Sequence, residues 1–236
     1  MLNLYPSQSR GHSQHSWLDS WHTFSFGGYH NPQRMGWGCL RVINQDRVVP
    51  GKGFAPHSHA DMEIVSYVLE GELAHKDSLG NGETIKPGDI QRMSAGTGIT
   101  HSEFNPNEGE FAHFLQLWFL PKATGITPSY EQKTFSQAEK TGRLALVISP
   151  DGREDSLHIH QDVEMRVALL NGHPPLTYSP KQGNVQWVQV AKGSLSLNGL
   201  QLNAGDGVAI SNELQLTLSD AQAAEVLLFD MANVRG

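Results

Sequence analysis

Residues 53–78 read GFAPHSHADMEIVSYVLEGELAHKDS, and this stretch alternates apolar runs with polar residues and glycine. The run Glu63–Leu69 is rich in β-branched and aromatic residues and stops before Gly71, as expected of a strand that ends in a turn. His57 and His59 are two positions apart, and such residues point to the same face of a strand. The stretch therefore predicts a β fold in which one strand presents two imidazoles together.

Short runs of the same kind recur along the whole chain, between turn signals. They are Leu40–Asn44, Phe114–Phe119, Leu144–Ile148, Val185–Val190 and Val226–Phe229. Helical periodicity is scarce, and we expect only one helical turn, around Ser136–Lys140, inside a connector over residues 122–140. The pattern predicts an all-β chain of two domains, residues 1–130 and 131–236.

The two halves also share a spacing of turn residues, which indicates an internal repeat. In each half an Asn-Gly pair is followed after five residues by Gly-Asp and then by a serine. These residues are Asn81-Gly82, Gly88-Asp89 and Ser94 in the first half, and Asn198-Gly199, Gly205-Asp206 and Ser211 in the second. We therefore expect two related β units packed together.

Composition excludes several classes of protein. The chain has 236 residues, with 17 Lys+Arg against 24 Asp+Glu and a formal net charge of −7, which disfavours direct binding to nucleic acid. A single cysteine, Cys39, forms no internal disulfide, and no run approaches the roughly 20 apolar residues of a membrane helix. The first residues lack the apolar core of a secretory signal. We expect a cytoplasmic protein, a monomer, with no membrane contact.

The candidate metal ligands are His57, His59, His101 and Glu103. Both pairs have strand spacing, so each pair can aim two side chains into one space. If the two strands face each other across a barrel, three imidazoles and one carboxylate surround a point. This donor set suits one divalent transition metal, with Fe or Ni favoured and Co, Cu or Zn allowed. It leaves coordination positions open, as catalytic sites do.

Other polar residues of the first half are weaker candidates. Glu63 lies four residues after His59, so an unbroken strand would place it on the ligand face, and we rank it behind Glu103 as the carboxylate ligand. His75 and His113 are expected at the surface, with a position behind the metal ligands as the alternative. The loop Ser94–Gly98, with two glycines, is expected to form a tight turn just before His101.

The second half is expected to lack the metal. Alignment without gaps places Ser179 and Lys181 at the first pair of ligand positions, and Leu218 and Asp220 at the second pair. Three of the four donors are thereby lost, and a lysine repels a cation. One rival site remains, because His158 and His160 have strand spacing and Glu164 follows them. We interpret that pair as ordinary polar strand positions.

These segments carry a family resemblance. Gly51-x5-His57-x-His59-x3-Glu63-x7-Gly71 resembles the first cupin motif, and Gly88-Asp89 through His101-x3-Asn105 resembles the second. The segments HSWLDSWHTFSF (15–26), 53–78, SAGTGITHSEFNP (94–106) and LHIHQD (157–162) resemble the pirin family of bicupins. GITPSYEQKTF (125–135) is similar to the bacterial quercetinase-like members. The proline expected in the second cupin motif is missing near Ser94, a departure that pirins share.

The resemblance implies two packed β-barrels of the cupin type, with metal only in the N-terminal one. It carries the family's ligands onto His57, His59, His101 and Glu103, and implies that Glu63 is not a ligand. It also implies cleavage of flavonols such as quercetin with dioxygen and release of carbon monoxide. In that reaction Glu103 would accept the proton of the substrate's 3-hydroxyl. The alternative is a metal-binding regulatory protein that acts through protein partners, as some pirins do.

Overall fold

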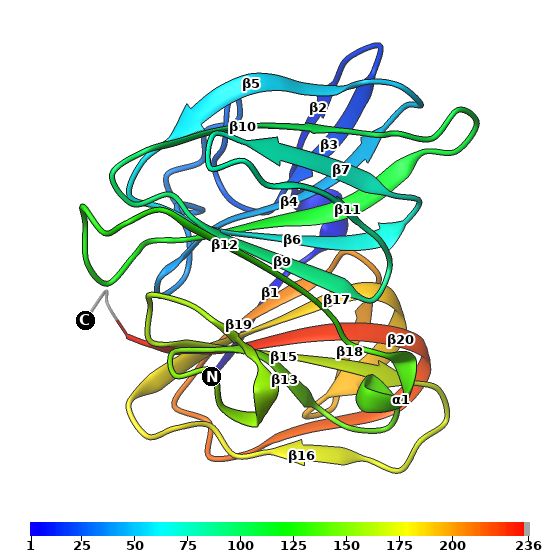
Figure 1. The fold of residues 1–236 in the computed structure, drawn as a ribbon. Coiled ribbons are helices and arrows are strands. Elements are labelled where there is room, and N and C mark those ends of the chain that lie inside the picture. Colours follow the sequence, from blue (N-terminus) through cyan, green and yellow to red (C-terminus); the bar gives the residue numbers. More distant parts are fainter. Residues whose placement is uncertain (234–236) are drawn as a thin grey trace.

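The computed structural model describes residues 1–233, which fold almost entirely into β-strands arranged in three sheets (Figure 1). A seven-stranded sheet contains, in spatial order, β12 (Ser129–Thr134), β9 (Asp89–Ser94), β6 (Glu63–Glu70), β11 (Ala112–Phe119), β4 (Leu40–Val48), β3 (Leu18–His22) and β2 (Gly11–Gln14). A four-stranded sheet contains β5 (Gly53–His59), β10 (Ile99–Phe104), β7 (Leu73–Asp77) and β8 (Gly82–Ile85). Together these two sheets form the first barrel.

The second barrel is built from one nine-stranded sheet that curls on itself. Its main order is β1 (Leu2–Tyr5), β19 (Gly207–Ser211), β17 (Asn184–Leu197), β20 (Leu216–Ala232), β15 (Val163–Leu170), β13 (Ala145–Ser149) and β14 (Leu157–His158). Strand β16 (Leu176–Tyr178) pairs with β20, and β18 (Leu200–Asn203) pairs with β17. The expected all-β architecture of two packed barrels is confirmed.

Within the described residues 1–233, helix is confined to three short segments: η1 (Ser7–Ser9), α1 (Gln137–Lys140) and η2 (Arg153–Asp155). The expected helical turn is α1, which begins after a capping box formed by Ser136 and Glu139. In residues 1–233 no helix is long and apolar enough to cross a membrane.

Both faces of the large sheet of the first barrel are buried, and this explains the near-continuous apolar run in β6. The odd-numbered residues Val65, Tyr67 and Leu69 pack in the apolar cluster that joins the two barrels. The even-numbered residues Ile64 and Val68 face the interior of the first barrel, where they belong to two smaller clusters. The sheet therefore separates the interface from the barrel interior.

Two strands cross between the halves. β1, at the start of the chain, pairs with β19 of the second barrel, with Leu2 opposite Ile210. β12, in the expected connector, pairs with β9 of the first barrel, with Ser129 opposite Ser94. The sheet of the second barrel thus includes a strand from the first expected domain, and the sheet of the first barrel includes a strand from the expected connector.

The two barrels share the same hydrogen bond at the turn, as the repeated turn residues predict. The amide of Lys86 donates to Oδ2 of Asp89, and the amide of Asn203 donates to Oδ2 of Asp206, both at 2.9 Å. In both cases an aspartate side chain bonds to the amide three residues before it. The same local turn therefore leads into β9 in one barrel and into β19 in the other.

The register of the ladders then shows how the two interiors differ. In the first barrel Ser66 lies opposite both Gln91 and Gln116, on the neighbouring strands. In the second barrel the matching position is Val188, which lies opposite Val208 and Leu228. At these positions the second barrel is filled by apolar side chains, whereas the first contains amides and hydroxyls.

Candidate metal centre

The three candidate histidines lie on two neighbouring strands. β5 and β10 pair antiparallel in the four-stranded sheet, with His101 opposite His57 and Ile99 opposite His59. The expectation that the two strands face each other across the barrel is therefore wrong. Adjacent strands are only about 5 Å apart, so side chains on the same face of neighbouring strands reach one another directly.

The imidazoles of His57, His59 and His101 form a compact group. One nitrogen from each lies within 4.8 Å of the others. Their ring centroids are 4.5 Å apart for His57 and His101, 4.8 Å for His57 and His59, and 5.0 Å for His59 and His101. Such spacing suits three nitrogens around one transition-metal ion, because each would bind at about 2 Å.

Hydrogen bonds leave ligand nitrogens free in this group. Nδ1–H of His57 donates to the carbonyl of Ala55 at 2.8 Å, which leaves its Nε2 with a lone pair. Nε2 of His101 is buried and has no hydrogen-bond partner among the described residues, 1–233. A buried nitrogen without a partner is costly unless it binds something. The residues therefore fit a metal ion.

The protonation state agrees with ligation. Burial, together with the neighbouring imidazole of His57, lowers the pKa of His59 to about 4. Burial and the imidazoles of His57 and His59 lower the pKa of His101 to about 3. Both side chains are therefore neutral at pH 7, and the neutral imidazole is the form that binds metal.

Glu103 lies next to this group, on β10 two residues after His101. Its carboxylate forms a second compact group with His101 and His75, with donor atoms within 4.8 Å. Nε2 of Gln116 donates to both carboxylate oxygens, at 2.8 and 2.7 Å, and the hydroxyl of Ser66 donates to Oε1 at 3.2 Å. Burial raises the pKa of Glu103 to about 7 against the effect of these hydrogen bonds.

The expectation that His75 lies at the surface is wrong, and the alternative, a position behind the metal ligands, is the one observed. It is 2% exposed on β7, and its Nδ1 accepts from Nε2 of Gln91 at 3.0 Å. Its Nε2–H therefore donates to Oδ2 of Asp77, also at 3.0 Å. Nδ1 of His101 lies 3.4 Å from Nδ1 of His75. Both nitrogens of His75 are thus occupied, and the residue supports His101 from behind.

His113 is also buried rather than exposed, at 5%. It faces the opposite side of β11 from Gln116, and its Nε2 bonds to Nε2 of Gln45 at 2.8 Å. The side chain therefore lies outside the metal centre. His113 and Gln116 are three positions apart on one strand, so their side chains point to opposite faces. This spacing in the sequence could have predicted that the two residues lie on different sides of the sheet.

Glu63 does not point toward the histidines, because the strand breaks between His59 and Glu63. β5 and β6 belong to different sheets. Glu63 instead turns to the interface between the barrels, where Ser94 donates to its Oε2 at 2.8 Å and the amide of His160 donates at 3.3 Å. Within residues 1–233, no group of metal donors includes Glu63, His158 or His160. The rival site is not assembled.

The alignment of the second half needs a correction in register. His75 pairs with Glu83, and the matching pair in the second barrel is Leu197 with Leu200. Glu103 pairs with His75, so its counterpart is Leu218, which pairs with Leu197.

By the same count Leu216 matches His101, and Tyr178, which pairs with Leu216, matches His57. Leu218 thus takes the place of Glu103 rather than of His101, and Tyr178 rather than Ser179 takes the place of His57. The offset arises because the segment between Ser211 and Leu216 is two residues shorter than its counterpart, and the segment between Tyr178 and Gly193 is one residue longer. In the corrected register the second barrel still lacks histidine and glutamate side chains at these positions.

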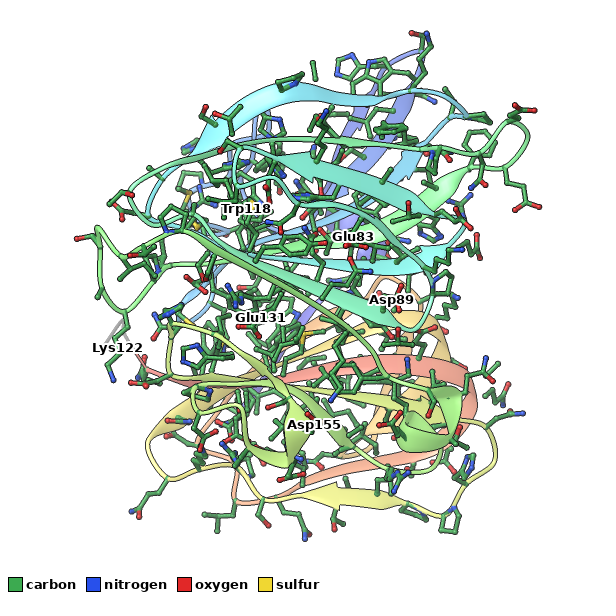
Figure 2. All side chains as sticks on the ribbon, viewed as in Figure 1. Glu83, Asp89, Trp118, Lys122, Glu131 and Asp155 are labelled. Atoms are coloured by element: carbon green, nitrogen blue, oxygen red, sulfur yellow. The ribbon has the colours of Figure 1, made fainter. Side chains whose placement is uncertain are left out.

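A cavity of about 510 Å³ opens beside the metal centre. All four candidate ligands line it, together with the aromatic side chains of Trp17, Phe26, Phe54 and Trp118. Figure 2 shows Trp118 among the side chains inside the first barrel, and Glu131 at the level where the two barrels meet. A space of this size, apolar on its walls, can hold a planar molecule of drug size next to the histidines.

Comparison with known proteins agrees with this geometry. The Pirin family model matches residues 5–119, and the model for the quercetinase C-terminal cupin domain matches residues 146–231. The chain is 47% identical over 235 residues to quercetin 2,3-dioxygenase of Escherichia coli K12, covering 99% of this chain and 100% of that protein. It is 38% identical over 233 residues to a pirin-like protein of Caulobacter vibrioides, covering 98% and 100%.

Solved structures give the same result. The bacterial pirin YhhW of Escherichia coli in complex with nickel(II) superposes with a TM-score of 0.94 at 45% identity, covering 99% of this chain and 100% of that one. Over nearly its whole length, in sequence and in both barrels, this chain belongs to the pirin family.

Proposed function

We propose that this protein is a metal-dependent dioxygenase that cleaves quercetin-like flavonols with dioxygen and releases carbon monoxide. One observation carries the proposal: three imidazoles and a buried carboxylate line an aromatic-walled cavity of about 510 Å³. The Escherichia coli relative that is 47% identical to this chain is named for this reaction.

We propose one divalent cation per chain, held in the N-terminal barrel by His57, His59, His101 and Glu103. Nickel and iron are favoured over cobalt, copper and zinc, and the nickel(II) complex of a relative supports a metal of this class. When bound, the cation supplies positive charge that stabilises a deprotonated oxygen of the substrate.

Glu103 then accepts the proton of the substrate's 3-hydroxyl. In the metal-free protein burial raises the pKa of this carboxyl group above that of an ordinary glutamate, and this tendency to hold a proton favours Glu103 as the proton acceptor. Gln116 and Ser66 fix the direction of the carboxylate through their hydrogen bonds. The base therefore needs little reorganisation before proton transfer.

The walls of the cavity hold the rings and exclude water. Trp118 stands edge-to-face on His59, with ring centroids 4.9 Å apart, and edge-to-face on Phe26 at 5.4 Å. Ile64 lies beside them on β6. These side chains give a planar apolar substrate a surface directly above the metal ligands, and water excluded there cannot quench the electron-rich anion.

The test is oxygen uptake in the presence of quercetin, with carbon monoxide as product. We expect His57→Ala and Glu103→Ala to abolish turnover, and the control His158→Ala to retain it, because His158 lies outside every group of metal donors. Elemental analysis of protein purified without added metal should give about one equivalent per chain. Turnover no faster than that of the free metal would instead favour a metal-binding regulatory protein.

The cytoplasmic location, the monomeric state, the absence of direct nucleic-acid contact and the existence of a protein partner stay predictions. The acidic balance of the sequence, 24 Asp+Glu against 17 Lys+Arg, supports the third of them.

A further inference from the structure

The cavity has a second polar region, outside the two groups of metal donors, on the sheet formed by β2, β3 and β4. We call it the β2–β4 wall, and it consists of Ser13, Ser20, His22, Asn44 and Asp46, all of which line the cavity. The register aligns these residues across the strands: Ser13 lies opposite Ser20, Ser20 opposite Asp46, and His22 opposite Asn44.

Most of the polar groups in this wall form hydrogen bonds with one another. Nδ1–H of His22 donates to Oδ1 of Asn44 at 2.8 Å, and Nε2 of His22 then accepts from the hydroxyl of Ser13 at 3.1 Å. Burial lowers the pKa of His22, so the ring stays neutral and keeps this arrangement. These three side chains use one another as partners, whereas Asp46 has acceptor capacity to spare.

Asp46 is buried without a cation. Its side chain is 3% exposed, and it takes part in no ion pair among residues 1–233. Its hydrogen-bond partner in that range is the hydroxyl of Ser20, which donates to Oδ1. A carboxylate has about four acceptor sites, so most of its capacity is unused. Buried carboxylates are otherwise almost always paired.

Neither packing nor the metal centre accounts for this residue. Asp46 belongs to neither of the two groups of metal donors. Asp46 lies opposite Phe114, and the matching pair in the second barrel is Ala168 opposite Val226, so an apolar residue serves the fold at that position. A buried, cation-free carboxyl group in a cavity is typical of a functional site.

We propose that Asp46, held by Ser20, determines specificity by binding a hydroxyl group on a ring of the substrate that does not contact the metal ligands. The inference rests on the proposed function and narrows its substrate class to aromatic molecules hydroxylated at two separate places. One hydroxyl lies at the histidines, and the other lies at the β2–β4 wall.

The chemistry of Asp46 favours a neutral hydroxyl as its ligand. Burial raises the pKa of Asp46 to about 7, so both protonation states are present near neutrality. The group can then accept from a hydroxyl or donate to one. A substrate amine would require the ionised carboxylate, which this buried environment disfavours.

The experiment measures binding without turnover, by quenching of tryptophan fluorescence under nitrogen, in metal-free and in nickel-loaded protein. The probes are quercetin and 3-hydroxyflavone, which keeps the 3-hydroxyl and the 4-carbonyl but lacks all other hydroxyls. The variants are Asp46→Ala and Ser20→Ala. Asp19→Asn is the matched control, because this carboxylate lies on β3 outside the cavity lining.

We expect Asp46→Ala to raise the Kd for quercetin about tenfold, the usual effect of one lost hydrogen bond, and to leave the Kd for 3-hydroxyflavone unchanged. Ser20→Ala should shift the Kd for quercetin in the same direction by less. The effect should appear with and without nickel, because the contact does not involve the metal. Asp19→Asn should bind both probes as wild type does.

An unchanged Kd for quercetin in Asp46→Ala, or an equal loss for both probes, would overturn the proposal. If Asp46→Ala does not fold, as judged by circular dichroism, Asp46→Asn and Ser20→Ala decide by the same criterion. Failure of the proposed function is separate: wild-type protein would then bind quercetin selectively through Asp46 yet consume no oxygen.

Discussion

Replacement of Asp46 by asparagine should change how the stability of the metal-free protein depends on pH. Burial raises the pKa of this carboxyl group from its ordinary value of 3.8 to about 7. Below about pH 4 the group is protonated in both the folded and the unfolded chain. Between pH 4 and pH 7 the unfolded chain ionises while the folded chain holds its proton, so the free energy of unfolding falls as the pH rises.

The magnitude follows from the size of the shift. A difference of about three pKa units, at 1.36 kcal/mol for each unit, amounts to about 4 kcal/mol. This stabilisation is present below pH 4 and is lost by about pH 7. The negative charge of Asp46 also helps to raise the pKa of Glu103. In Asp46→Asn the pKa of Glu103 should therefore be lower, and the variant should lose less stability as the pH rises. Asparagine keeps the shape of the side chain but does not titrate.

The assay is urea unfolding from pH 4 to pH 8 with a chelator present, followed by tryptophan fluorescence. The free energy of unfolding of wild type minus that of Asp46→Asn should fall by up to about 4 kcal/mol across this range. Infrared spectra should show a protonated carboxyl band at pH 6 that is weaker in the variant. A difference in stability that does not depend on pH would refute the reasoning, because Asp46 would then be ionised in both states.

Three further substitutions test other parts of the structure. Gln116→Leu removes both amide hydrogen bonds to the carboxylate of the metal centre and should lower metal affinity by about 10- to 100-fold in competition with a chelator. Tyr67→Phe removes the 2.5 Å hydrogen bond to Glu225 across the barrel interface and should cost about 2 kcal/mol in urea unfolding. Gly96→Ala should cost roughly 3 kcal/mol, because φ is +46° and the new Cβ would lie 2.0 Å from the carbonyl oxygen of Ile126; wild-type stability there would show that the loop relaxes.

The strands could be predicted from the sequence because the alternation of side chains is a local property. Leu40–Asn44 lies in β4, Phe114–Phe119 in β11 and Val185–Val190 in β17. The two histidine–donor pairs could be predicted for the same reason, since i and i+2 share a face wherever the strand lies. The tight turn at Ser94–Gly98 also follows from local glycine chemistry, although it brings the backbone close to Ile126 rather than to the metal centre.

The environment of the ligands could not be predicted, because it depends on which strands become neighbours. The sequence places His75 on a strand but does not show that this strand pairs with β10, behind His101. Glu63 would share a face with His57 and His59 only if β5 and β6 formed one continuous strand. Asp46 and Ser20 are 26 positions apart, and only the pairing of β3 with β4 brings them together.

The same contrast explains why, within residues 1–233, both groups of metal donors lie in the first barrel. Both barrels use the same ladder, yet Ser66, Gln91 and Gln116 in the first match Val188, Val208 and Leu228 in the second. Valine and leucine fill an interior without needing partners, whereas amides and hydroxyls in the first barrel must bond to something buried. Here that partner is the carboxylate of Glu103 or the ring of His75. These polar side chains are therefore the supporting layer that holds the donors of a metal centre in place, and the matching positions of the second barrel are filled by apolar side chains instead.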